Sequence, residues 1–143
     1  MQSEALMERY LEEVVRLGRV ELIDEMALPD MVDEANQAFG GPPGRAGLVA
    51  HVKGFHRCIH DFEMEVIEIV GGNDHVMAWW QFSGVHAGPW LGQTPTNEVI
   101  SATVFSFFHL ENGLVSRYRL WLNAGFREPM VFDSRLALAA KQS

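Results

Sequence analysis

The sequence predicts an α+β domain in which three N-terminal helices pack on a curved, mostly antiparallel sheet around a central pocket. In the first 59 residues, apolar side chains recur at the three- and four-residue spacing of helices. From residue 62 they alternate at every second position, which is typical of strands with one buried face. A long apolar hairpin over residues 100–123 then supplies the centre of the expected sheet.

The hairpin is predicted from two strand-like runs on either side of Asn112-Gly113. Asn and Gly accept positive φ angles, so this dipeptide is a strong signal for a tight turn between strands. One face of the first arm is apolar except for Ser106. On the return arm the apolar row comprises Leu114, Tyr118, Leu120 and Leu122, while Arg117, Arg119 and Asn123 point the other way.

The helices are predicted from apolar stripes and from the residues that begin and end them. The first spans residues 4–19 with Ser3 as its N-cap, and a shorter one spans residues 20–28 before Pro29 stops it. Residues 31–35 form a short strand and residues 40–44 a loop. The third helix spans residues 45–59, where Leu48, Val52, Phe55 and Ile59 make one stripe.

Three further segments complete the predicted sheet and the end of the chain. Residues 62–66 and 76–83 alternate as strands around the turn at residues 71–74. Residues 84–97 form a loop rich in Gly and Pro that leads into the hairpin. Beyond Gly125 the sequence indicates a loop and a short helix over residues 133–141.

Length and composition indicate one globular domain over residues 1–143, with 48% hydrophobic and 21% charged residues. The net charge is −8 and the eleven Lys and Arg residues are scattered, which argues against nucleic acid or a membrane as partner. The longest uncharged run is too short for a membrane-spanning helix, and no secretory signal is visible, so we expect a cytoplasmic protein. A small apolar or polycyclic ligand remains as the expected partner.

Cofactor and metal sites are not expected. Cys58 is the only cysteine, so an intrachain disulfide or a cysteine-based zinc site is excluded. Among the six histidines, His56 and His60 are four residues apart without an accompanying acidic ligand. We expect neither a metal nor a cofactor.

Several motifs resemble those of the SnoaL-like polyketide cyclases, which have the nuclear-transport-factor-2-like fold. The run Gly84-Val85-His86-Ala87-Gly88, followed by Gly92-Gln93-Thr94-Pro95-Thr96, resembles the family's Gly-x-His-x-Gly…Gly-x-x-Pro-Thr loop. The segment at residues 59–61 sits where that family often has Phe-Pro-Asp, and residues 111–115 sit at its Asp-Gly-Lys-Ile turn. The resemblance covers nearly the whole chain and implies a cone-shaped fold, a cofactor-independent activity and a homodimer.

The resemblance also implies where catalytic residues should lie, and two of those positions differ. Counted from Gly113, the family's pocket histidine falls on Ser106 and its catalytic aspartate falls on Leu120. In those cyclases the aspartate removes a carbon-bound proton next to a carbonyl, which leucine cannot do. Trp79 stands where many relatives carry an arginine that faces the pocket, and His86 is expected to brace the family loop.

Asp33, Tyr118 and Ser106 are the predicted catalytic residues. Asp33 aligns with a polar pocket residue of the cyclases and could serve as a relocated base, although a solvated turn acid has the same pattern. Tyr118 could donate a hydrogen bond to a ligand carbonyl or be a core aromatic residue. Ser106 could bind the ligand or its own backbone.

Aromatic and apolar side chains are the predicted ligand contacts. Tryptophans 79, 80 and 90 suit a flat polycyclic ligand, although aromatic residues in a strand more often belong to a core or a dimer interface. Gln81 shares a strand face with Trp79 and is the polar candidate there. The predicted contacts are Trp79, Gln81, Trp90, Leu120, Asn123 and Phe55.

Three hypotheses follow from these observations. The first is a SnoaL-like cyclase or isomerase that acts by acid–base chemistry on a polycyclic or apolar carbonyl compound. The second is a non-catalytic small-molecule binder, favoured by the replaced aspartate and histidine. The third is a homodimer through the sheet as the main feature, with Arg117 and Arg119 facing solvent or pairing with acids on the strand of Glu63 in a second subunit.

Overall fold

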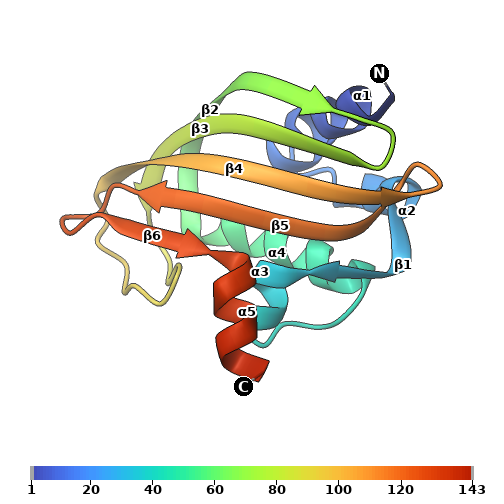
Figure 1. Cartoon of the computed structure of the whole chain (residues 1–143). Helices are drawn as coiled ribbons and strands as arrows, with labels where there is room; N and C mark the ends of the chain where they lie inside the picture. Colours follow the sequence, from blue (N-terminus) through green and yellow to red (C-terminus); the bar gives the residue numbers. More distant parts are fainter. Residues whose placement is uncertain (1, 143) are drawn as a thin grey trace.

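A curved six-stranded sheet forms the frame of the protein, which is described here for residues 2–142 of a computed structural model (Figure 1). The strand order is β1-β5-β4-β3-β2, and β6 also pairs with β5. The α+β class predicted from the sequence is therefore confirmed. The strands are β1 (Ala27–Asp33), β2 (Ile59–Gly71), β3 (His75–His86), β4 (Val99–Glu111), β5 (Leu114–Ala124) and β6 (Met130–Asp133).

The four long strands β2 to β5 form the predicted antiparallel meander. Between β4 and β5, Asn112 and Gly113 have φ angles of 51° and 77°, as a tight turn of this sequence requires. The apolar row of β4, with Ser106 in it, is buried along its whole length. This row faces the helices, so the hairpin fixes which side of the sheet carries the core.

The edge of the sheet differs from the prediction, because two short strands share β5 as their partner. β1 pairs with β5 in parallel and places Asp33 next to Tyr118, whereas β6 pairs antiparallel with residues 121–124. The sequence predicted a helix up to residue 28 and a strand at 31–35, and it missed β6. Pro29 lies inside β1, which is possible because proline is tolerated in edge strands.

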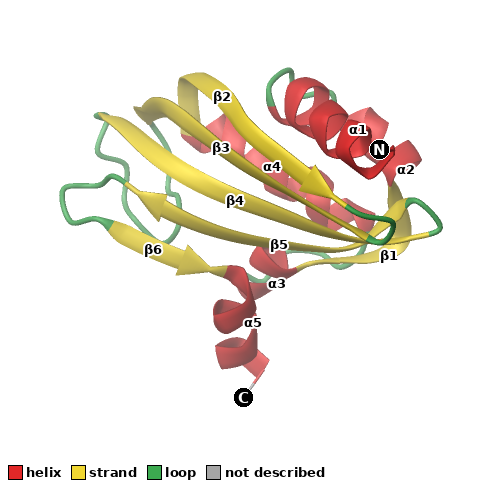
Figure 2. Ribbon diagram, turned by 45° about the horizontal axis from the view of Figure 1, so that its top comes forward, coloured by secondary structure: helices red, strands yellow, loops and turns green. Residues whose placement is uncertain are grey.

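The helices of the first 58 residues cover the concave face of the sheet, as Figure 2 shows from a second side, whereas the C-terminal helix projects from the edge of the sheet. The first predicted helix is an α-helix that continues as one π-helical segment, and the helix predicted for residues 20–28 is reduced to two short turns. Ser3 lies inside the first helix, and its buried hydroxyl has no hydrogen-bond partner among residues 2–142, so it is not the predicted N-cap. The helices are α1 (Gln2–Arg9), the π-helix (Tyr10–Val15), a 3-10 turn (Val20–Leu22), α2 (Ile23–Met26), α3 (Glu34–Ala38), α4 (Arg45–Cys58) and α5 (Ser134–Gln142).

Helix α4 lies nearly where the sequence placed it and forms one wall opposite the sheet. The C-terminal helix α5 was also predicted within a residue, and it packs against α3 and the β5–β6 edge (Figure 1). None of the helices within residues 2–142 is long and apolar enough to cross a membrane. The space between α4 and the concave face of the sheet contains the candidate site.

Candidate active site

A cavity of about 360 Å³ lies between α4, the concave face of β3–β5 and the loop that follows β3. Its walls are mostly apolar, and within the described chain no Asp or Glu side chain lines it. Any acid–base chemistry in the cavity must therefore use other groups. The apolar wall includes Phe55, Trp80, Phe82, Trp90, Leu120 and Leu122, and the polar lining residues are Tyr10, Asn36, His51, Arg57, Cys58 and Tyr118.

His51 is the one lining residue that can exchange a proton near neutral pH and has a buried carboxylate behind it. Its Nδ1 lies 2.7 Å from Oδ2 of Asp33. Asp33 is only 1% exposed, and its other oxygen accepts a hydrogen bond from the backbone N–H of Asn36 at 3.1 Å. Both carboxylate oxygens of Asp33 are thus occupied, one capping α3 and the other orienting the histidine.

The Asp33 contact fixes the chemistry of the imidazole. An ionised carboxylate accepts the Nδ1 proton, which leaves the lone pair of Nε2 as the base. Burial favours a lower pKa for His51, but the charge and the hydrogen bond of Asp33 outweigh it and raise the pKa above the ordinary value. His51 is therefore a stronger base than a free histidine, with its basic nitrogen left for a ligand in the cavity.

Tyr118 lies beside His51 and carries the hydroxyl that can act as donor. The two rings are nearly parallel with their centroids 5.9 Å apart. The Tyr118 hydroxyl lies 2.8 Å from Oγ of Ser106, which accepts a hydrogen bond from the indole N–H of Trp80 at 3.0 Å. Because Trp80 donates to Ser106, the serine hydroxyl can donate onward to Tyr118 and leave the phenol proton available for a ligand.

Burial keeps Tyr118 protonated. It raises the pKa of Tyr118 well above the ordinary value for tyrosine, although the hydrogen bonds with Ser106 and Tyr10 oppose the shift. The pKa of Tyr10, which also lines the cavity, is raised by the same cause. The cavity thus combines one base with phenols that remain hydrogen-bond donors at neutral pH.

The predicted catalytic residues lie together, but in different roles from those expected. Asp33 is not a solvated turn acid and does not line the cavity; it contacts the ring of His51 instead. Ser106 is fully buried and reaches the cavity only through Tyr118 and Trp80. Tyr118 itself lines the cavity.

The predicted ligand contacts divide between the two faces of the sheet. Trp90, Leu120 and Phe55 line the cavity. Trp79, Gln81 and Asn123 do not, which corrects their predicted place in the pocket. They lie on the convex face because side chains alternate along a strand, and Trp79 stacks there on Phe105 with centroids 5.9 Å apart.

Sequence reasoning missed His51 and chose the wrong one of two adjacent tryptophans. His51 lies three residues after Leu48 and four before Phe55, so the apolar stripe of α4 already placed it on the inward face. Trp80 belongs to the buried row with Val76, Ala78 and Phe82. Periodicity therefore contained both signals, and the assignment from the family resemblance pointed to Trp79 instead.

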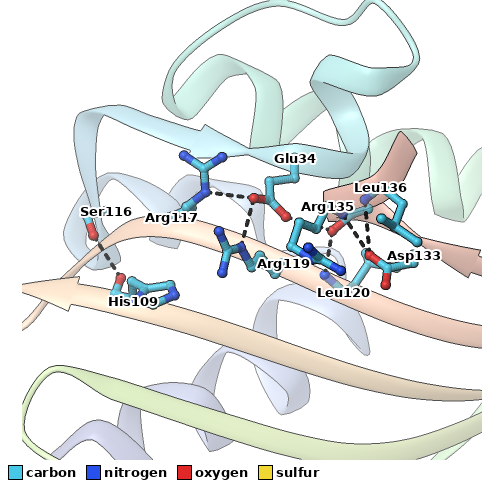
Figure 3. A network of polar contacts seen from close by, with 10 residues as sticks. Glu34, His109, Ser116, Arg117, Arg119, Leu120, Asp133, Arg135 and Leu136 are labelled. Atoms are coloured by element: carbon cyan, nitrogen blue, oxygen red, sulfur yellow. Dashed lines mark hydrogen bonds and ion pairs between the residues drawn. The ribbon is translucent and has the colours of Figure 1, made fainter. Parts of the chain in front are cut away.

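Arg117 and Arg119 are partly exposed, and within the chain they share a buried partner on α3. Their Nε atoms donate to Oε2 of Glu34 at 2.7 and 2.9 Å, and Figure 3 shows both guanidinium groups directed at this carboxylate. Ser134 donates to the other oxygen of Glu34 at 3.0 Å and accepts from the backbone N–H of Leu120 at 2.9 Å. Glu34 is 1% exposed, so this network ties α3 and α5 to β5.

The loop over residues 87–98 closes the remaining side of the cavity. The backbone N–H of Thr96 donates to Nδ1 of His86 at 3.3 Å, and the Thr96 hydroxyl lies 3.2 Å from the same nitrogen. The expected bracing role of His86 is therefore present. The thiol of Cys58 also bonds the carbonyl of Pro89 at 2.9 Å, and burial raises the pKa of this thiol.

Metal ligands do not gather in the part of the chain that the structure describes. No group of three or more His, Cys, Asp or Glu side chains within residues 2–142 is placed to hold a metal ion.

The curved sheet, the covering helices and the enclosed cavity define a protein of the nuclear-transport-factor-2-like fold. The sequence model of the SnoaL-like polyketide cyclases matches residues 5–124. The chain therefore belongs to the SnoaL-like polyketide cyclase family. No curated protein sequence matches the chain significantly.

Solved structures support the fold. TsrD from Streptomyces laurentii is similar with a TM-score of 0.72 and 22% identity, covering 87% of this chain and 88% of its own. A SnoaL-like polyketide cyclase from Agrobacterium tumefaciens has a TM-score of 0.68 and 13% identity, with 100% of both chains covered. IdmH from Streptomyces antibioticus has a TM-score of 0.65 and 19% identity, with 99% of both chains covered.

Proposed function

We propose that the protein is a cofactor-independent cyclase or isomerase that acts by acid–base chemistry on a polycyclic or otherwise apolar carbonyl compound. The observation that carries this proposal is the 2.7 Å contact between His51 and Asp33, made by a histidine that lines an apolar cavity. A buried carboxylate that orients an imidazole is a recurring arrangement for a general base. His51 thus takes the place of the aspartate that the family usually carries at the position of Leu120.

The proposed reaction begins with Nε2 of His51 removing a proton from the carbon next to the ligand carbonyl. The electron pair of the C–H bond moves into the new C=C bond, and the carbonyl oxygen becomes an enolate that accepts a hydrogen bond from Tyr118. Asp33 stabilises the imidazolium that forms. In an isomerisation His51 returns the proton to another carbon; in a cyclisation the enolate carbon attacks a second carbonyl and His51 protonates the resulting alkoxide.

Solvent deuterium incorporation tests this function directly. Wild-type protein is incubated in D₂O with polyketide-type β-keto esters and cyclic enones, and mass spectrometry follows exchange at the carbon next to the carbonyl. We expect exchange above background, and we expect His51→Gln to reduce it by roughly a thousandfold, within the range that a general base contributes. His75→Gln, which changes a half-exposed histidine in the β2–β3 turn region, serves as the matched control.

Two other outcomes would contradict catalysis by His51. Exchange that survives in His51→Gln would mean that another group is the base. Compounds that raise the melting temperature without any exchange would support the non-catalytic binder instead, which the Leu120 and Ser106 replacements favour.

We also propose that two copies pair through the convex face of the sheet. Its centre is aromatic: Trp79 stacks on Phe105, whose ring centroid lies 5.8 Å from that of Trp121. Met77 and Trp79 are 40% and 37% exposed there. Acids of β2 flank this centre on one side and Arg117 and Arg119 flank it on the other, so a two-fold axis along the middle of the sheet would bring opposite charges together.

Light scattering after size-exclusion chromatography tests the dimer. We expect wild type to elute as a dimer and Trp79→Glu to elute as a folded monomer, because the change places a charge at the aromatic centre. Asn73→Glu adds the same charge in the exposed β2–β3 turn and should leave the dimer intact. A monomeric wild type would refute the pairing.

A further inference from the structure

Arg57 is a cation on the cavity wall that makes no ion pair within residues 2–142. It lies in the last turn of α4, is exposed, and lines the same cavity as His51. Other arginines, such as Arg16 and Arg119, hold carboxylates at 2.7 and 2.9 Å, whereas Arg57 is in none of the ion pairs formed by the described residues. Its guanidinium therefore offers free donors to whatever occupies that end of the cavity.

Gly54 lies between His51 and Arg57 on the same helix and leaves the wall open there. Glycine inside a helix is unfavourable and usually has a packing reason. At Gly47 that reason is clear, because a Cβ atom would lie 2.3 Å from the carbonyl oxygen of Pro42. At Gly54 a Cβ would meet only the guanidinium of Arg57, at 3.8 Å, so packing does not explain this glycine.

We propose that the ligand carries a carboxylate that Arg57 binds across Gly54, while its reacting carbonyl lies between His51 and Tyr118. This inference rests on the proposed function for the position of the carbonyl. The guanidinium of Arg57 lies beside Gly54, about one helical turn from His51, so the ligand would place its carboxylate and its carbonyl about one turn apart along α4. The substrate class is thus an apolar keto acid rather than a neutral ketone.

A carboxylate fits the charges better than a phosphate. The planar guanidinium of one arginine can hold either group in a two-point contact, but its single positive charge balances only a monoanion. The chain as a whole has a net charge of −8, so a dianionic group would be repelled by the rest of the surface. A single unpaired arginine at an apolar cavity accordingly selects a monoanion.

Paired ligands test the proposal. The probes are tetralone- and naphthyl-ketone-derived carboxylic acids, each compared with its own methyl ester, at pH 8. Binding is followed by quenching of tryptophan fluorescence, because Trp80 and Trp90 line the cavity. We expect each acid to bind wild type at least about tenfold more tightly than its ester, the scale of a charge-assisted hydrogen bond.

Three variants locate the binding preference in the cavity. Arg57→Gln should remove the preference for acids by weakening acid binding more than ester binding, whereas Lys53→Gln, which removes an exposed cation of α4 outside the cavity lining, should keep the preference. Gly54→Ala should weaken binding of acids and esters alike while raising the melting temperature, because alanine favours the helix.

The outcomes separate this inference from the proposed function. Equal affinity of acids and esters, or a preference that survives in Arg57→Gln, overturns the carboxylate site even if deuterium exchange is observed. A preference lost in Arg57→Gln without any exchange supports the carboxylate site and overturns the proposed chemistry. The absence of quenching by every probe overturns the carboxylate site, whereas the proposed chemistry is decided by deuterium exchange alone.

Discussion

Asp33 and Glu34 are adjacent in the chain, equally buried and opposite in what they do. Each is 1% exposed, yet Asp33 bonds His51 at the cavity and Glu34 bonds Arg117 and Arg119 on the other side of the strand. The turn from β1 into α3 sends the two side chains apart. Of these two neighbouring acids, one thus orients a side chain of the cavity and the other holds helices against the sheet.

The difference between the two carboxylates lies in their partners. Arginine keeps its charge at every relevant pH, so the Glu34 network is a fixed set of ion pairs. Histidine gains and loses its proton near neutrality, so the Asp33 contact can take part in proton transfer. Burial of a carboxylate therefore indicates a constrained position, and the partner decides whether that position is structural or catalytic.

The largest expected effect on stability comes from removing Glu34. Glu34→Ala leaves two arginines and the Ser134 hydroxyl without their shared acceptor, and loss of one member of a buried ion network typically costs about 3 kcal/mol or more. We expect the free energy of unfolding, from guanidinium titration, to fall by about that amount. Deuterium exchange measured well below the melting temperature should be affected far less than in His51→Gln.

A Glu34→Ala variant as stable as wild type would show that the Glu34 ion pairs do not stabilise the fold. A folded variant that lost exchange as completely as His51→Gln would show that Glu34 belongs to the site.

Asp33→Asn should reduce the rate of deuterium exchange less than His51→Gln does, and it should shift the pH dependence of that rate. In wild type the pKa of His51 is raised, so exchange should increase as pH rises through that pKa and the basic nitrogen becomes free. Asparagine removes the charge, so the rising limb should move to lower pH while the maximal rate falls by about ten- to a hundredfold through loss of orientation. Rate–pH profiles of both proteins, with identical substrate, measure the shift.

The free energies of unfolding of wild type and Asp33→Asn should depend differently on pH in the range where His51 loses its proton. A histidine whose pKa is raised by folding stabilises the protein fully below its unfolded pKa, near 6.5, and this contribution is lost as pH rises through the folded pKa. The free energy of unfolding of wild type should therefore decrease across that window, and Asp33→Asn should lack this decrease. Parallel profiles for the two proteins would contradict the coupling of His51 to Asp33.

The sequence predicted the frame well because the frame depends on local patterns. The Asn112-Gly113 turn, the apolar row around Ser106 and the stripe of α4 each follow from spacing alone. The sequence failed where partners are distant in the chain. β1 and β6 form because both pair with β5, and no local signal opposed the helix expected up to residue 28.

The site was only partly predictable for the same reason. Asp33 and Tyr118 were predicted as site residues, but the histidine that both of them contact, His51, is 18 residues from Asp33 and on another element. The same holds for Arg117, whose partner Glu34 is 83 residues away. A residue's type and face can be inferred from spacing, whereas the partner that determines its role requires the tertiary structure.

The smallest effect expected is that of Ser106, the residue at the family's usual histidine position. Ser106→Ala removes the acceptor of the Trp80 indole and one contact of the Tyr118 hydroxyl, and a lost buried hydrogen bond costs about 1 kcal/mol. Because Ser106 does not line the cavity, ligand affinity should stay within a few-fold of wild type, while exchange falls by about tenfold through poorer orientation of Tyr118. Urea unfolding, probe binding and exchange on the same preparation measure these three effects.

Tyr118→Phe is the matched variant: if Ser106 acts only through the phenol, Ser106→Ala should change exchange little when Tyr118 is already phenylalanine. Full additivity of the two changes would instead mean that Ser106 affects the ligand independently, and its buried position behind Tyr118 argues against that.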